Sequence, residues 1–245
     1  MGLPHKNRQQ LKRFKDFDFA RIIFFDKLKG VFHVLIYASK NKKMKEDTFS
    51  NKNTDIENKD NSIKNPSNPS SDYPTGLTEE QQQRQNNYRI KLSKVKDFNE
   101  TFELVKSAVD AKFKMHRAGL SLVLQVLPTQ LGAYHILGSN MIIMNKRILD
   151  TIKLRKSLLE YNAYLFMVLC HEYFHSFGII DEKQVRIMTY DLCQSLLGDD
   201  HPSSLMAKYE PWKVFPELQL YQTNKFENRF EIITNFDKTT QSYIN

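Results

Sequence analysis

The chain has 245 residues and a formal net charge of +8 at pH 7, with 40% hydrophobic, 12% aromatic and 26% charged residues. This composition is typical of a globular protein that buries a real core and has polar, non-folding sequence attached. The only two cysteines, Cys170 and Cys193, lie in apolar context without CxxC spacing, which excludes a disulfide scaffold and a cysteine zinc site. The longest apolar run, residues 163–170, is too short to cross a bilayer and no secretory signal is evident, so we expect a cytoplasmic protein.

The positive charge is concentrated at the N-terminus. Residues 1–45 contain 12 Lys/Arg and 3 Asp/Glu, a net charge of +9, and the other 24 Lys/Arg and 25 Asp/Glu give −1. We therefore interpret residues 1–40 as a basic, aromatic-rich arm. Residues 20–39 contain two β-branched and aromatic runs separated by DKLKG, a pattern that predicts a hairpin turning near Gly30.

The next segment, residues 41–87, is rich in Asn, Asp, Lys, Ser and Pro and has few large apolar residues. Such a segment cannot bury enough surface to offset the entropy lost on ordering, so we expect a disordered linker. Residues 88–245 are then expected to form one folded domain with a C-terminal tail.

Within this domain, hydrophobic periodicity predicts several helices and at least one strand. A helix is expected over about 98–115, with Asp97 or Asn99 as its cap. The run 120–127 is ambiguous between a strand and a buried helix, and 140–145 predicts a short strand. A capping box formed by Ser157 and Glu160 opens a helix that we expect to end near Phe177, with Gly178 as terminator. Helical spacing then continues from Val185 to Gly198, and the tail from about 213 gives no clear prediction.

The stretch LCHEYFHSFGIIDEKQVR, residues 169–186, contains the candidate site. On a helix His171 and His175 lie on one face, so both can direct a ring nitrogen at one zinc ion. Glu172 lies one step round the helix, beside the ion, where a carboxylate can take and deliver protons during hydrolysis. The apolar residues before His171 indicate a buried helix, in which two imidazoles and a carboxylate without partners would cost several kcal/mol. These residues therefore predict a site for one Zn²⁺ ion.

HEYFHSFGIID resembles the HExxHxxGxx(H/D) signature of the metzincin-like zinc metallopeptidases. The resemblance implies an α+β minimal zincin-like domain, with a small mixed sheet and a central active-site helix. It also implies that His171, His175 and Asp181 are the metal ligands, that Glu172 is the general base and that Gly178 is the turn. Residues 140–144 resemble the edge strand that in small zincins aligns an extended peptide substrate, so we expect an edge strand here. The detailed match covers about a dozen residues, and a looser one extends from about 98 to 200.

Some residues depart from this pattern. The family's usual third ligand is a histidine, and Asp181 could instead cap the next helix together with Gln184. Glu182 and His201 are the alternative third ligands. Met188 superficially matches the methionine turn of metzincins, but its helical spacing favours core packing.

A second pair of residues, Tyr134 and His135, could stabilise a developing oxyanion, although an ordinary loop pair is the plainer interpretation.

Three functions are compatible with these residues. The first is a zinc-dependent metallopeptidase acting on a peptide or protein substrate. The second is a hydrolase similar to small bacterial zinc endoribonucleases, which share an HxxxHxxGxxH arrangement; Phe14, Phe17 and Phe19 in the basic arm could then contact nucleic acid. The third is a non-catalytic zincin-like module that binds metal. Glu172 favours the peptidase, since it stands where peptidases place their proton-transferring residue.

Overall fold

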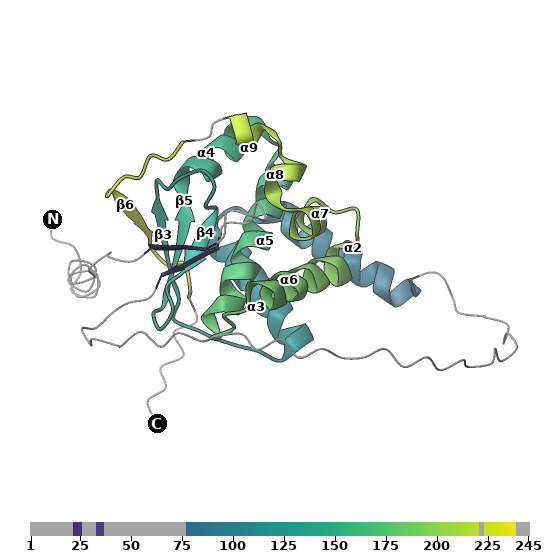
Figure 1. Ribbon diagram of the computed structural model, residues 1–245. Helices are drawn as coiled ribbons and strands as arrows, with labels where there is room; N and C mark the ends of the chain where they lie inside the picture. The colour runs from purple at the N-terminus through teal and green to yellow at the C-terminus, as the bar shows by residue number, and fades with distance from the viewer. Residues whose placement is uncertain (1–21, 26–32, 37–76, 221–222, 239–245) are drawn as a thin grey trace, which may run out of the picture.

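The computed structural model describes residues 22–25, 33–36, 77–220 and 223–238. Apart from strands β1 (Ile22–Phe25) and β2 (His33–Ile36), which pair antiparallel with Ile22 opposite Ile36, the N-terminal arm lies outside the described residues. The expected linker over 41–76 lies outside them too. The described part of the chain is a mixed α+β structure (Figure 1).

The larger of the two described sheets is mixed and has four strands in the order β4-β5-β3-β6. Its strands are β3 (Ser121–Gln125), β4 (Ala133–His135), β5 (Met141–Asn145) and β6 (Phe230–Ile233). Strand β3 pairs parallel with β5, and β4 and β6 are antiparallel to their neighbours. The ambiguous run 120–127 is therefore a strand, because its aliphatic side chains lie buried in the middle of the sheet.

The helices are α2 (Glu79–Lys94), α3 (Phe98–Phe113), α4 (Lys146–Arg155), α5 (Leu158–Ser176), α6 (Glu182–Leu197), α7 (Pro202–Tyr209), α8 (Pro211–Val214) and α9 (Glu217–Leu220). The capping box of Ser157 and Glu160 opens α5, and the helix ends just before Gly178, as the sequence predicts. Asp97 caps α3 by accepting a hydrogen bond from the Glu100 backbone N–H at 2.7 Å.

Helix α5 is the centre of the core. Nearly all of its side chains from residue 162 to 174 are buried, and Tyr164, Phe166 and Phe174 have no exposed surface. In Figure 1 the helix runs through the middle of the molecule, between the sheet and helices α2, α3, α6 and α7. Burial of each Leu- or Phe-sized side chain stabilises the fold by about 1.5–3 kcal/mol, so this packing holds the helix rigidly. The histidines at its C-terminal end are thus placed on a fixed support.

Two expectations about element positions are wrong. The linker cannot extend to residue 87, because α2 begins at Glu79, where Thr78 and Gln81 form a capping box that the polar composition concealed. The strand near 140–144 is not an edge strand, because β5 lies between β4 and β3. Strand β4 occupies the edge instead.

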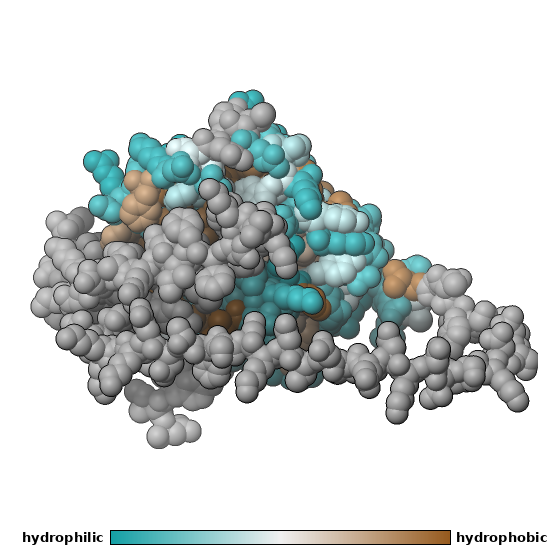
Figure 2. Space-filling view, in the orientation of Figure 1, coloured by the Kyte–Doolittle hydropathy of each residue, from teal (hydrophilic) through white to brown (hydrophobic). Residues whose placement is uncertain are grey.

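The described residues contain no helix that is both long and apolar enough to span a membrane. On the face shown in Figure 2 the coloured, described side chains are largely hydrophilic, and the hydrophobic ones form separate small patches.

Candidate metal centre

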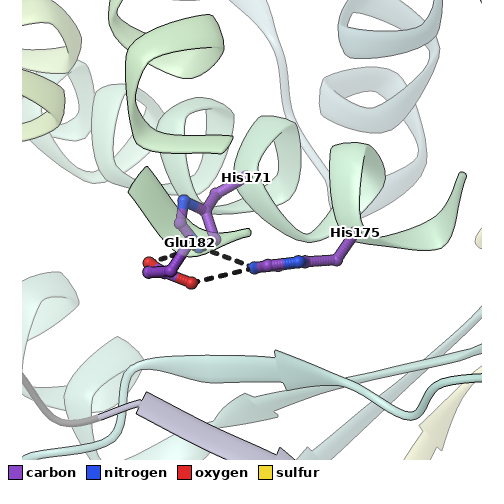
Figure 3. A group of neighbouring side chains, drawn as sticks. All are labelled: His171, His175 and Glu182. Carbon is purple, nitrogen blue, oxygen red and sulfur yellow. Dashed lines mark hydrogen bonds and ion pairs between the residues drawn. The ribbon is translucent and has the colours of Figure 1, made fainter. Parts of the chain in front are cut away.

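Three side chains from two helices converge at the C-terminal end of α5. His171 and His175 lie on its last turns, and Glu182 is the first residue of α6. Between the helices the chain turns at Gly178, whose φ of 85° lies in the left-handed region that favours glycine. Figure 3 shows the two imidazole rings and the carboxylate pointing toward one another. The turn thus brings residues from successive helices to one point.

The distances within this group are short. Glu182 Oε1 lies 3.1 Å from His171 Nε2, and its Oε2 lies 3.1 Å from His175 Nε2. The two Nε2 atoms are 3.2 Å apart. In a tetrahedral zinc site with ligand distances of about 2.0–2.1 Å, neighbouring ligand atoms lie roughly 3.3–3.4 Å apart. The observed separations are therefore close to those of three ligands around one ion.

The hydrogen bonds of His175 explain why the group favours a cation. His175 Nδ1 lies 2.8 Å from the carbonyl oxygen of Ile179. A carbonyl only accepts, so this Nδ1 carries the hydrogen, and in the neutral ring Nε2 holds an unprotonated lone pair. That lone pair faces the Glu182 carboxylate and a second imidazole. Acceptors that face one another repel unless a proton or a metal ion lies between them.

The pKa values of Glu182 and His175 are shifted by their mutual contacts. Burial acts to raise the pKa of Glu182, but hydrogen bonds from His171 and His175 hold it well below its usual range. Burial acts to lower the pKa of His175, but the hydrogen bond to Glu182 and the charge of Glu172 outweigh it, so this pKa is raised. In the absence of metal, protons satisfy the carboxylate. A metal ion could take their place, since metal ligands must be deprotonated.

Glu172 lies beside the group and is not part of it. Its side chain is only 4% exposed, and its Oε2 has no hydrogen-bond partner among the described residues. Burial raises the pKa of Glu172, whereas His171, His175 and a hydrogen bond from the backbone N–H of His135 oppose the rise. The hydroxyl of Tyr164 is also buried without a described partner, and burial raises its pKa, with a further rise caused by Glu172.

A pocket of about 430 Å³ adjoins these groups. His171, Glu172 and Glu182 form part of its wall, and the buried side chain of Tyr164 also lines it. Its other walls come from the loop before β4, from α6 and from α7 to α9. The pocket therefore places space for a small ligand directly against the convergent histidines and the buried carboxylate.

Asn145 holds the loop that borders this pocket. The side chain is fully buried, and the two hydrogens of its Nδ2 are shared among the carbonyl oxygens of Leu127, Pro128 and Leu131, which lie 2.9–3.1 Å away. Its Oδ1 accepts from the backbone N–H of Leu127 at 3.2 Å. One amide thus satisfies four backbone groups of an irregular segment, which fixes the pocket wall next to β4.

The structure brings together some of the residues that the sequence suggests as ligands, but not Asp181. Glu182 joins the two histidines, whereas Asp181 caps α6 by accepting from the Gln184 backbone N–H at 3.0 Å. His201 is also outside the group, because it caps α7 through Nδ1, which accepts from Ser203 N at 3.2 Å. Within the described residues, no other group of three His, Cys, Asp or Glu could hold a metal ion.

Tyr134 and His135 lie in strand β4 and not in a loop. His135 is 6% exposed with no partner for Nδ1 among the described residues, and burial together with the charge of Arg117 lowers its pKa to about 4. It is thus a neutral imidazole near His175 at neutral pH. Met188 packs against the main core, as its helical spacing predicts.

Sequence reasoning missed two pocket residues that helical spacing alone could have indicated. Tyr164 precedes His171 by seven residues, two turns along the same face of α5. Arg186 follows Glu182 by four residues on α6, so it also lies on the same face as a member of the group. Both side chains line the pocket.

Comparisons of the chain with protein-family models, with curated proteins and with solved structures find no match in any of the three.

Proposed function

We propose that this chain is a zinc-dependent metallopeptidase with a minimal zincin-like domain. The observation that supports this most is the convergence of His171, His175 and Glu182 at one point, with the buried carboxylate of Glu172 beside them. Two histidines and one carboxylate are a ligand set of catalytic zinc sites, in which a fourth position stays open for water or substrate. Glu182, not Asp181, is the third ligand in this proposal.

Zinc in this position would lower the pKa of a water molecule toward 7 and polarise the carbonyl of the scissile bond. Glu172 accepts the proton of the attacking water and then delivers it to the leaving amine. Its carboxylate suits this role because Oε2 has no hydrogen-bond partner among the described residues and remains available to a proton.

The peptide would lie along the edge strand next to the site. Among the described residues β4 pairs with β5 alone, and it contacts α5, the helix of the histidines. An extended peptide can add to such an edge through main-chain hydrogen bonds. It would then present one carbonyl to the metal centre, and a neighbouring side chain would enter the pocket.

The test is zinc content followed by hydrolysis. By elemental analysis we expect about one zinc per chain in the wild type and in Glu172→Gln, and none in His175→Ala. On a fluorogenic peptide library, Glu172→Gln should lower the rate by about 10²- to 10⁴-fold. Glu80→Gln, an exposed glutamate on α2, is the matched control and should keep full activity.

Two results would contradict the proposal. Folded wild-type protein, never exposed to chelator, that contains no metal would overturn the metal centre. Zinc-loaded protein whose hydrolysis is the same in Glu172→Gln would remove Glu172 as the base, and zinc-loaded protein that cleaves no peptide would favour a non-catalytic metal-binding module.

A further inference from the structure

Beyond the metal group, the pocket contains a second set of charged side chains. Arg186, Glu210 and Lys213 line it, and the other charged residues of its described wall are Glu172 and Glu182. Two cations and one anion leave this part of the pocket with a net positive charge. An anionic ligand group is the electrostatic complement of such a surface.

Arg186 is placed to contact a ligand that also reaches the metal group. It lies one helical turn after Glu182 on α6, so the two residues are separated by about 6 Å along the helix axis. In a peptide, the carboxylate carbon of the residue after the scissile bond lies only three bonds from the scissile carbonyl carbon, a few Å away. A long arginine side chain can span the remaining distance.

The guanidinium of Arg186 has hydrogen-bonding capacity left over. Its Nη1 donates to Glu210 Oε1 at 3.2 Å, and this is its one hydrogen bond to the described residues. A guanidinium has five N–H donors, and two of them can bind one carboxylate side by side. The remaining donors are therefore available to a planar anion in the pocket.

Glu210 combines an unusual backbone conformation at the C-cap of α7 with a side-chain contact to Arg186. Its φ of 77° and ψ of 146° lie in a region that is essentially restricted to glycine. A glutamate at this position is strained, yet its carboxylate is the group that holds Arg186. Glu210 is thus a positioning residue, which keeps the guanidinium directed into the pocket.

We propose that the pocket binds a carboxylate on the residue that immediately follows the scissile bond, and that Arg186 recognises it. This inference rests on the proposed peptidase function, for which it specifies the substrate class. The apolar side chains of Met167, Met206 and Leu218 line the same pocket and suit the rest of that residue. The carboxylate is either the C-terminus of the peptide or the side chain of Asp or Glu, and both present the same chemistry to Arg186.

Binding of three small probes to zinc-loaded full-length protein tests this proposal. The probes are N-acetyl-Ala-Leu with a free C-terminal carboxylate, its C-terminal amide, and N-acetyl-Ala-Glu amide, whose only carboxylate is in the side chain. Calorimetric titrations use the Glu172→Gln background, so that the probes are not hydrolysed. We expect at least one carboxylate probe to bind about tenfold or more tightly than the neutral amide. The tighter of the two identifies the source of the carboxylate.

Substitution of Arg186 tests whether this residue causes the preference for carboxylate probes. Arg186→Gln should reduce the ratio of acid to amide affinity to about one. Lys183→Gln, an equal change of charge at an exposed position of the same helix, should leave the ratio unchanged. Equal binding of acid and amide by the parent protein, a preference that survives in Arg186→Gln, or no binding of any probe at millimolar concentration would each overturn the proposal.

The variant Glu210→Gly shows whether Glu210 positions Arg186 or only affects the stability of the fold. Glycine relieves the strained backbone, so the Tm should rise, while the acid preference should fall because Arg186 is no longer held. A raised Tm with an unchanged preference would show that Glu210 has a structural role only. These readouts are binding and stability, so they fail independently of the proposed function, which is decided by zinc content and hydrolysis in the Glu172 variants.

Discussion

The Lys106–Asp237 pair and the group of His171, His175 and Glu182 are both at least partly buried, but they differ in hydrogen bonding. In the first, donors face acceptors, and in the second, acceptors face one another. Lys106 on α3 and Asp237 after β6 have side chains that are 3% and 0% exposed, and Lys106 Nζ lies 2.7 Å from Asp237 Oδ1. The other carboxylate oxygen of Asp237 accepts from the backbone N–H of Leu120 at 3.1 Å. In both contacts a donor faces an acceptor. Asp237, which follows β6, is thereby joined to α3 through Lys106 and to the residue before β3 through Leu120.

At the metal centre the pattern is the opposite. Two imidazole nitrogens and a carboxylate face one another, and the nearby polar atoms of Glu172 and Tyr164 are buried without described partners. Buried polar atoms are normally satisfied, so a group of facing acceptors calls for a ligand. The first group is an ion pair within the protein, whereas the second is a group that could hold a metal ion.

The largest effect on stability is expected when the Lys106–Asp237 ion pair is broken. Lys106→Met removes a buried cation that lies 2.7 Å from Asp237 Oδ1, and we expect the free energy of unfolding to fall by about 3–5 kcal/mol. Urea unfolding followed by circular dichroism measures this change. Lys94→Met, at an exposed position on α2, is the control. A fall in the free energy of unfolding below about 1 kcal/mol would mean that the Lys106–Asp237 ion pair contributes little to stability.

Zinc bound by His171, His175 and Glu182 should raise the free energy of unfolding by a comparable amount. At a free zinc concentration about 1,000 times Kd, a ligand that binds only the folded state adds about 4 kcal/mol. Glu182→Gln should lose most of this increment, because an amide is a much weaker zinc ligand than a carboxylate. Asp181→Asn should retain it, since asparagine is an equally good helix cap. The reverse result would make Asp181 the third ligand.

A third effect concerns acid stability and a histidine outside the metal group. Burial, together with the charge of Arg89, lowers the pKa of His201 to about 4. Between its unfolded value near 6.5 and about 4, only the unfolded chain takes up the proton, so stability is lost as the pH falls through this window. The contribution is on the order of 2–3 kcal/mol.

The matched variant is His201→Asn, because asparagine can cap α7 without titrating. Unfolding free energies of both proteins at pH 7 and pH 4 measure the difference. The wild type should lose about 2–3 kcal/mol more than the variant on acidification. Equal losses would show that this imidazole is protonated in the folded state as readily as in the unfolded one.

The smallest effect is expected at the residue that the sequence favoured as third ligand. Asp181→Ala removes the cap of α6 and should lower the free energy of unfolding by about 1 kcal/mol. Zinc content by elemental analysis should stay at one per chain. Loss of zinc from this variant, with Asp181→Asn also deficient, would place Asp181 in the metal centre after all.

The sequence by itself determined the local features of this protein. The capping box at Ser157, the apolar run of α5 and the terminating Gly178 are short-range signals, and each is visible as helix start, buried face or turn. The positions of His171 and His175 on one face follow from the helical period alone. These features depend on residues within a few positions of one another, so they can be read without the fold.

Only the tertiary structure decided which residue completes the group and what surrounds it. Asp181 and Glu182 are adjacent in sequence, and the turn after α5 decides that one caps α6 while the other faces the histidines. Likewise, β4 lies at one edge of the sheet because β5 pairs with β3 on its other side, and Glu210 meets Arg186 because α7 packs against α6. Such contacts depend on long-range packing, which no local pattern of residue types encodes.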